Sequence, residues 1–366
     1  MNRLKLIILF LCLCLLWGCS NDMNRREIDE INFIHVMGID YSSNEYTLTA
    51  VYSLGQGADS EKGDAGKEEI SQGKGATPYE AFQNLILKNK KTVSIANTGY
   101  FLIGDRAARH GIDRCLDFLS RDETVKMESL LFVTKDTDAA DFINQSLENQ
   151  QVIHEDLEAV EQKQRELVTR NDNTFVNIIN ETENNMTGVL IPYLVSENNT
   201  FLLQGYAVFY RNELVDYLDM ETSSGINFLK DIIRAFPIYL DDVGLSVTRS
   251  KCKLKTDIYE SHITVKVNLE FETAVKEIFT NKNIFTGDEL ERLTHMQNAY
   301  ILDIIKKAVN YSAQNKQDIL QISRLIKTRY AKKWRDYEEN WSDILAEIQY
   351  EYEIKSKISK SFILGN

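Results

Sequence analysis

The side chains that could serve as nucleophiles, bases or metal ligands are few and widely spaced along this chain. The five histidines are His35, His110, His154, His262 and His295. None of them lies at the spacing of a zinc motif such as His-Glu-x-x-His, and the sequence has no Gly-x-Ser-x-Gly nucleophile elbow. We therefore expect a protein that is not an enzyme and that has no catalytic residues, no metal site and no cofactor.

One cysteine, Cys19, does lie in a pattern with its own chemistry. It ends the sequence Leu16-Trp17-Gly18-Cys19, which closes an apolar run over residues 6–17. Such a run is shorter than the about 20 residues of a membrane-spanning helix and fits the about 7–15 residues of a signal-peptide core. The pattern resembles the lipobox of bacterial lipoproteins, in which the cysteine thiol receives a diacylglyceryl group and the chain is cut before it.

The leader therefore predicts a signal peptide over residues 1–18 and a lipidated tether over residues 19–26. Two acyl chains hold a protein on a bilayer, whereas a single chain binds only marginally. An ordinary cleaved signal peptide and an uncleaved anchor are the alternatives. The rest of the sequence has no second long apolar run, so we expect no other segment to cross a membrane.

Cys115 and Cys252 are the cysteines left for the folded body, because Cys12 and Cys14 lie in the leader. An exported pair could form a disulfide. Both residues, however, occupy apolar positions, one on a predicted helix and one on a predicted strand. We favour two buried free thiols and leave the pairing open.

The charge of the chain limits its partners. The formal net charge is −13, and it moves to −15 when the leader takes two basic residues, Arg3 and Lys5, with it. An acidic body argues against nucleic acid and against broad adhesion to anionic lipid. A hydrophobic content of 43% is enough to form buried hydrophobic cores, as a folded protein requires.

The N-terminal domain is predicted over residues 27–195 as a mixture of helices and strands. Two strands joined at Ser42-Ser43-Asn44 are predicted to form a hairpin. Thr77-Pro78-Tyr79-Glu80 predicts a helix start, because Thr77 can cap it and Glu80 completes a capping box. The polar composition of residues 136–188 indicates exposed helix and a linker.

The C-terminal domain is predicted over residues 200–366 as an α+β unit with long helices. Apolar and polar residues alternate strictly over residues 263–272, which indicates an antiparallel sheet with one solvent-exposed face. Thr286-Gly287-Asp288-Glu289 reads as a second capping box that begins a long helix. The predicted fold class is therefore α+β and multi-domain, with mixed or antiparallel sheets each packed with helices.

The order of short motifs along the chain resembles the Ger(x)C family of spore germination lipoproteins, the C subunits of spore germinant receptors. No single motif is decisive, but their order across the mature chain is. The motifs are the lipobox, Arg26-Glu27-Ile28, Gly38-Ile39-Asp40, Thr77 to Ala81, Ile103-Gly104-Asp105, Gly205-Tyr206-Ala207-Val208-Phe209, and Asp318 to Trp341 with Tyr330 and Lys332-Lys333-Trp334.

The resemblance implies a lipid-anchored membrane protein on the outer face of the spore inner membrane. It implies docking on the multipass membrane A and B subunits of the germinant receptor, without catalysis and without a cofactor. The first alternative is a solute-binding lipoprotein that captures a small germinant itself. An exported enzyme is the second alternative, and it lacks a reactive group of residues in the sequence.

A partner surface is expected around Lys332, Lys333, Trp334 and Trp341. Aromatic residues dominate the energetics of interfaces, and these two tryptophans accompany a local basic run in an acidic chain. The alternative is that the tryptophans close the C-terminal core and that the lysines lie on a solvated helix face.

Overall fold

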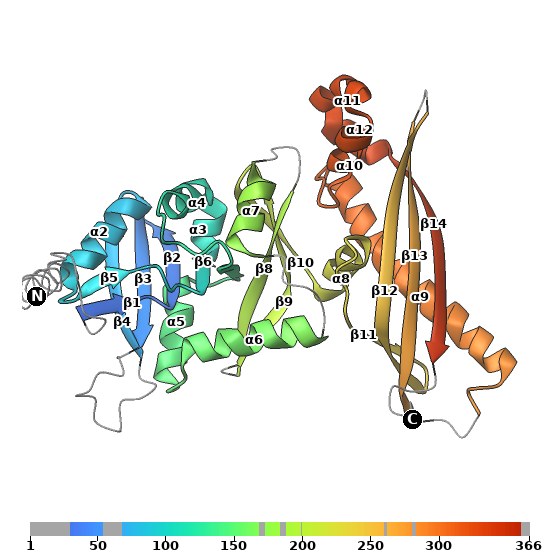
Figure 1. Ribbon diagram of the computed structural model, residues 1–366, viewed down its shortest axis with the longest axis horizontal. Coiled ribbons are helices and arrows are strands. Elements are labelled where there is room, and N and C mark those ends of the chain that lie inside the picture. The colour runs from blue at the N-terminus through green and yellow to red at the C-terminus, as the bar shows by residue number, and fades with distance from the viewer. Residues whose placement is uncertain are drawn as a thin grey trace, which may run out of the picture.

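The computed structural model describes residues 30–53, 68–167, 173–183, 188–198, 200–259, 262–279 and 283–359. Cys19 and the whole of the predicted leader lie outside these residues. The described strands form an eight-stranded sheet, a four-stranded sheet and a two-stranded pair. Figure 1 shows the two larger sheets side by side, each with its own helices. This is the α+β, multi-domain fold predicted from the sequence.

The larger sheet is mixed. Its order is β10-β9-β8-β7-β6-β2-β3-β4, parallel from β8 to β2 and antiparallel toward both edges. Every residue of β6 and β7 is buried, because helices cover both faces there. The strands are β2 (Val36–Ser42), β3 (Glu45–Ser53), β4 (Glu68–Gly75), β6 (Tyr100–Gly104), β7 (Leu130–Thr134), β8 (Val189–Glu197), β9 (Thr200–Tyr210) and β10 (Glu213–Leu218).

The helices lie on opposite faces of this sheet. Consecutive strand residues, such as Phe101 and Leu102, belong to separate hydrophobic clusters because their side chains point to opposite faces of the sheet. One cluster contains residues of α2 (Pro78–Lys88), α3 (Asp105–His110), α4 (Asp113–Ser120) and α7 (Phe175–Thr182). The other contains residues of α5 (Ala139–Glu148) and α6 (Ile153–Leu167).

The helices α5, α6 and α7 differ from the polar linker expected over residues 136–188. Phe142, Leu157 and Phe175 have 1%, 0% and 0% of their surface exposed. The sequence misleads here because the apolar residues of these helices stand among many polar ones in the surrounding segment. Only packing against the sheet shows that they belong to the core.

The larger sheet also continues past the expected boundary between residues 195 and 200. β9 pairs with β8 along its length, and β10 pairs with β9. Arg211 and Asn212 form the tight turn between β9 and β10 with φ of 51° and 67°, the left-handed conformation that two-residue hairpin turns require. The predicted hairpin between β2 and β3 is confirmed, with Ser43 and Asn44 at φ of 53° and 62°.

The smaller sheet has the order β11-β12-β13-β14 and packs on the 28-residue helix α9. Val265, Val267 and Leu269 are fully buried, while Lys251 and Lys253 on β12 are exposed, so the predicted one-sided sheet is confirmed. β14 pairs in parallel with β13 because helices carry the chain back between them. The strands are β11 (Phe236–Leu240), β12 (Val243–Ile258), β13 (Ile263–Ile278) and β14 (Gln349–Ser359); the helices are α8 (Met220–Leu229), α9 (Gly287–Gln314), α10 (Ile322–Arg329), α11 (Ala331–Tyr337), η2 (Glu338–Asn340) and α12 (Trp341–Glu347).

The two predicted capping boxes have different outcomes. Thr77 Oγ1 accepts a hydrogen bond from the Glu80 amide at 3.1 Å, and the Glu80 carboxylate accepts one from the Ala76 amide at 2.8 Å. Thr286 lies at the N-cap of α9 but makes no side-chain capping bond, and Glu289 pairs instead with Arg292. A capping motif therefore located both helix starts but specified the hydrogen bonds at only one.

Candidate functional site

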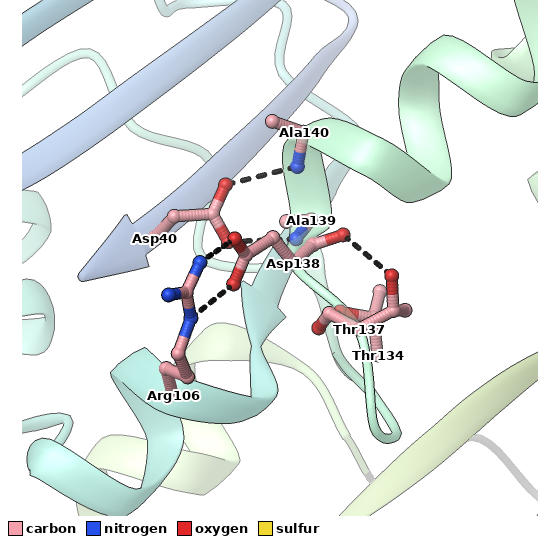
Figure 2. Close-up of polar contacts among 7 residues, drawn as sticks. All are labelled: Asp40, Arg106, Thr134, Thr137, Asp138, Ala139 and Ala140. Atoms are coloured by element: carbon pink, nitrogen blue, oxygen red, sulfur yellow. Dashed lines mark hydrogen bonds and ion pairs between the residues drawn. The ribbon is translucent and has the colours of Figure 1, made fainter. Parts of the chain in front are cut away.

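Asp40, near the C-terminal end of β2, lies beside the N-terminus of α5, which packs against this strand (Figure 2). Its two carboxylate oxygens accept hydrogen bonds from the backbone amides of Ala139 at 2.7 Å and Ala140 at 2.9 Å. The first amides of a helix have no partner within the helix, and its positive end favours an anion. Asp40 therefore fixes α5 to the sheet from about a hundred residues away in sequence.

Gly104 makes this contact possible. A Cβ atom at this position would lie 2.0 Å from Oδ1 of Asp40 and 3.0 Å from the amide nitrogen of Ala139. Gly38 is similarly close to α5, since its Cβ would lie 2.9 Å from Cδ1 of Ile143. The motifs Gly38-Ile39-Asp40 and Ile103-Gly104-Asp105 thus meet at one helix end, a proximity that the sequence did not reveal.

Burial controls the electrostatics of Asp40. Desolvation raises the pKa of its carboxyl group to about 7, although the two amide hydrogen bonds oppose the shift. Asp138 and Asp141, both acidic, raise it further. Arg106 balances this local charge by pairing with Asp138 through Nε at 3.0 Å and through a second contact of Nη2 (Figure 2).

The neighbouring Asp105 extends the network toward the sheet edge. Its carboxylate accepts hydrogen bonds from Nε of Arg109 at 2.8 Å and from the hydroxyl of Tyr217 at 2.7 Å. Both bonds stabilise the charged carboxylate, and the pKa of Asp105 lies below its ordinary value despite partial burial. Because the oxygens of Asp40 and Asp105 are already bound by protein donors, this network positions elements and has no open acid or base.

The expected partner residues separate into two groups. Trp334 and Trp341 are 4% and 2% exposed, and their rings meet edge to face at 5.1 Å, so both tryptophans lie in the C-terminal core of the described chain. Lys332 and Lys333 are exposed on the short helix α11. The structure thus does not bring these four residues together on one surface.

Asp318 organises the core around these tryptophans. It is 1% exposed, and its oxygens accept hydrogen bonds from the amides of Ile322 at 2.8 Å and Ser323 at 2.7 Å and from Nε1 of Trp341 at 3.2 Å. Burial raises the pKa of Asp318. A buried aspartate at a helix N-terminus therefore occurs in both halves. The sequence marked both segments as family motifs without indicating these roles.

The remaining candidate residues form no reactive centre in the described part of the chain. Cys115 and Cys252 are free and buried, and burial raises the pKa of each thiol to about 12. His35 and His154, far apart in sequence, have ring centroids 5.5 Å apart. Burial and the neighbouring His154 lower the pKa of His35. Within the described ranges, no group of three or more His, Cys, Asp or Glu residues could hold a metal ion.

A large cleft lies between the two halves of the described chain. This interdomain cleft has a volume of about 970 Å³ and is lined by residues of α7, β12, α10 and the segment after α8. Glu181 of α7 accepts a hydrogen bond from Nε2 of Gln321 at 2.6 Å and pairs with Lys230 at 3.5 Å, so polar contacts join the two halves across it. Among the described helices, none is both long enough and apolar enough to cross a membrane.

Comparison with known proteins shows the class of this fold. The crystal structure of the GerBC protein matches with a TM-score of 0.57 at 18% identity, covering 88% of this chain and 96% of that chain. Two family models also match, the spore germination protein N-terminal domain over residues 24–196 and the spore germination B3/GerAC-like C-terminal domain over residues 204–361. The fold is that of a spore germination protein of two family domains.

Curated relatives match over nearly their whole length. Spore germination protein B3 of Bacillus subtilis (strain 168) is 23% identical, with 97% of this chain and 96% of the relative covered. Spore germination protein GerQC of Bacillus cereus is 18% identical, with 98% and 99% covered. The chain belongs to the Ger(x)C family of spore germination proteins.

Proposed function

We propose that this protein is the lipid-anchored C subunit of a spore germinant receptor and acts in germination without catalysing a reaction. It is held on the outer face of the spore inner membrane by a diacylglyceryl group on Cys19. The observation that carries the proposal is the match of both family domains, which together span nearly all of the chain after the leader.

The position of the chain start supports the anchoring. The first described strand, β1 (Ile31–Phe33), lies at the end of the molecule remote from the four-stranded sheet (Figure 1). A lipid on Cys19 would therefore hold the eight-stranded sheet near the bilayer and leave β11 to β14 extended away from it. That arrangement presents the C-terminal half to the exposed loops of neighbouring subunits.

The subunit acts by docking on the multipass A and B subunits. Tethering to the same membrane raises the effective concentration of the partners, so individually weak contacts suffice. Docking changes the balance between resting and active receptor only if this subunit binds the two states with different affinity. Exposed charged residues such as Lys332 and Lys333 on α11, next to the buried tryptophan pair, support such a role.

An affinity purification from detergent-solubilised spore membranes tests the proposal. A chain tagged at its C-terminus should retain the multipass A and B subunits. The matched control is the tagged Cys19→Ala variant expressed at the same level, which should recover far less of them because it lacks the tether. Recovery of the tagged chain alone under mild detergents that keep the A and B subunits together would contradict the proposal.

The interdomain cleft favours a second candidate function, capture of a small solute. Its walls bring together amide, carboxylate and cationic groups, among them Asn180, Glu181 and Arg324, as a site for a small polar molecule requires. Calorimetry of residues 20–366 with amino acids, sugars and nucleosides distinguishes the two functions. The receptor-subunit proposal expects no micromolar binding, whereas binding that Arg324→Ala abolishes would establish the solute-binding function.

A further inference from the structure

The first described strand, β1, lies beside a small basic surface. β1 pairs in parallel with β5 (Thr92–Ser94), with Ile31 opposite Thr92. The two residues that precede Thr92, Lys90 and Lys91, are lysines in the loop after α2. Strand register therefore places β1, the first described strand, next to the loop that carries these lysines.

This surface, the entry patch, consists of Leu87, Lys88, Lys90 and Lys91, all of which are exposed. Leu87 is 81% exposed, the highest value among the large apolar side chains of the described residues. Lys88 donates a hydrogen bond to the carbonyl oxygen of Gln72. It lies in the last turn of α2, where a positive charge interacts favourably with the C-terminal end of the helix dipole. Lys90 and Lys91 lie beyond the C-cap residue Asn89, where the helix does not require them.

The length of chain before β1 limits how far this patch can lie from a lipid on Cys19. Residues 19–30 span at most about 40 Å when fully extended. Because Ile31 is paired beside the patch, a tether fixed in the bilayer holds the patch within that reach. The four-stranded sheet at the other end of the molecule lies much farther along the long axis (Figure 1).

The charge of the patch is opposite to that of the whole chain. With a formal net charge of −13, the body as a whole is repelled by an anionic bilayer, whereas the three exposed lysines at the end of α2 and in the loop after it are attracted. An exposed leucine among lysines can enter the headgroup region while the ammonium groups contact lipid phosphates. We propose that Leu87, Lys88, Lys90 and Lys91 rest on anionic lipid headgroups and orient the protein on the membrane.

The inference rests on the proposed anchoring, so the test replaces the natural anchor. Residues 20–366 are coupled through an N-terminal histidine tag to nickel-chelating lipid in vesicles, which makes the result independent of lipidation at Cys19. A fluorophore is attached at Leu87→Cys, and a nitroxide quencher is placed on the lipid headgroups. The native Cys115 and Cys252 are buried and should not react under native conditions.

On vesicles with anionic lipid, the fluorophore at position 87 should be quenched, and the quenching should decrease as salt shortens the Debye length from about 10 Å at 0.1 M to about 3 Å at 1 M. A fluorophore at Phe279→Cys, 75% exposed in the C-terminal half, should remain unquenched. Replacing Lys88, Lys90 and Lys91 together by glutamine should abolish the quenching at position 87.

The charge-matched control replaces Lys251, Lys253 and Lys255, three exposed lysines on the outer face of β12, by glutamine, and it should leave the quenching unchanged. Thermal melting verifies that each variant is folded. Equal quenching at positions 87 and 279, or quenching equal on neutral and anionic vesicles, would overturn the inference. So would equal effects of the two triple substitutions.

Discussion

The carboxylate of Asp40 lies directly against the Cα atom of Gly104, so that a Cβ at position 104 would approach Oδ1 to 2.0 Å. Two strands of the central sheet, β2 and β6, meet in this contact at the N-terminus of α5. Because Gly104 has no side chain, Asp40 can make its hydrogen bonds to α5. The first prediction tests this dependence.

Gly104→Ala should lower the free energy of unfolding by about 1–3 kcal/mol, the usual cost of overpacking a buried site, because the new methyl group displaces the Asp40 carboxylate. Chemical denaturation of the whole chain measures the change. Gly99→Ala is the matched control in the same region. The nearest atom to its new Cβ is the carbonyl oxygen of His35 at 3.9 Å, so it should change stability little. Equal effects of the two substitutions would contradict the prediction.

The stability of the protein should depend on pH through Asp40. Its pKa is about 7 in the folded protein against about 3.9 in an unfolded chain. The folded state therefore holds a proton that the unfolded state has lost, and the stability contributed by neutral Asp40 is lost as pH rises from about 4 to about 7. Above pH 7 the contribution should no longer change.

Asp40→Asn isolates this effect from that of other buried carboxyls, such as Glu68 and Asp318, whose pKa values are also raised. The variant is close in shape to the neutral acid and does not titrate, so its stability carries no pH dependence from this position. The unfolding free energy of the native protein minus that of the variant should therefore fall between pH 5 and pH 8. A constant difference across that range would show that Asp40 does not titrate there.

The two buried tryptophans should respond differently to phenylalanine. Nε1 of Trp341 donates to Asp318, whereas Nε1 of Trp334 has no hydrogen-bond partner among the described residues. Trp341→Phe should therefore cost about 1–3 kcal/mol more than Trp334→Phe, because it leaves a buried carboxylate without one donor. Trp334→Ala should cost about 3–5 kcal/mol as a core truncation. Urea unfolding of the three variants measures these values; unchanged unfolding with lost partner binding would assign the tryptophans to an interface.

Cys19→Ala should leave an unprocessed precursor or release the protein from the membrane, because the diacyl chains supply its membrane affinity. Fractionation of spore membranes follows the protein, and mass spectrometry of the mature N-terminus identifies the modification. Cys115→Ala is the control, since that thiol is buried and should not affect localisation. An unmodified Cys19 in the native protein, or cleavage at another residue, would refute the anchoring.

The sequence alone determined the local elements. The turn at Ser43 and Asn44, the cap at Thr77 and the one-sided strand β13 follow from residue types within a few positions of one another, and the structure confirms them. Local preference sufficed because the dihedral angles of a turn and the spacing of apolar residues on one face are set by neighbouring residues. The ordered motifs also sufficed to indicate the family.

Tertiary structure decided everything that depends on distant partners. It buried the stripes of α5, α6 and α7, added β9 and β10 to the larger sheet, and enclosed Trp334 and Trp341 in a core. It also joined Asp40 to a helix about a hundred residues later and placed Ile31 beside Thr92. Burial and strand register are properties of which surfaces meet, and the same short polar or apolar pattern fits several such arrangements until the whole chain is packed.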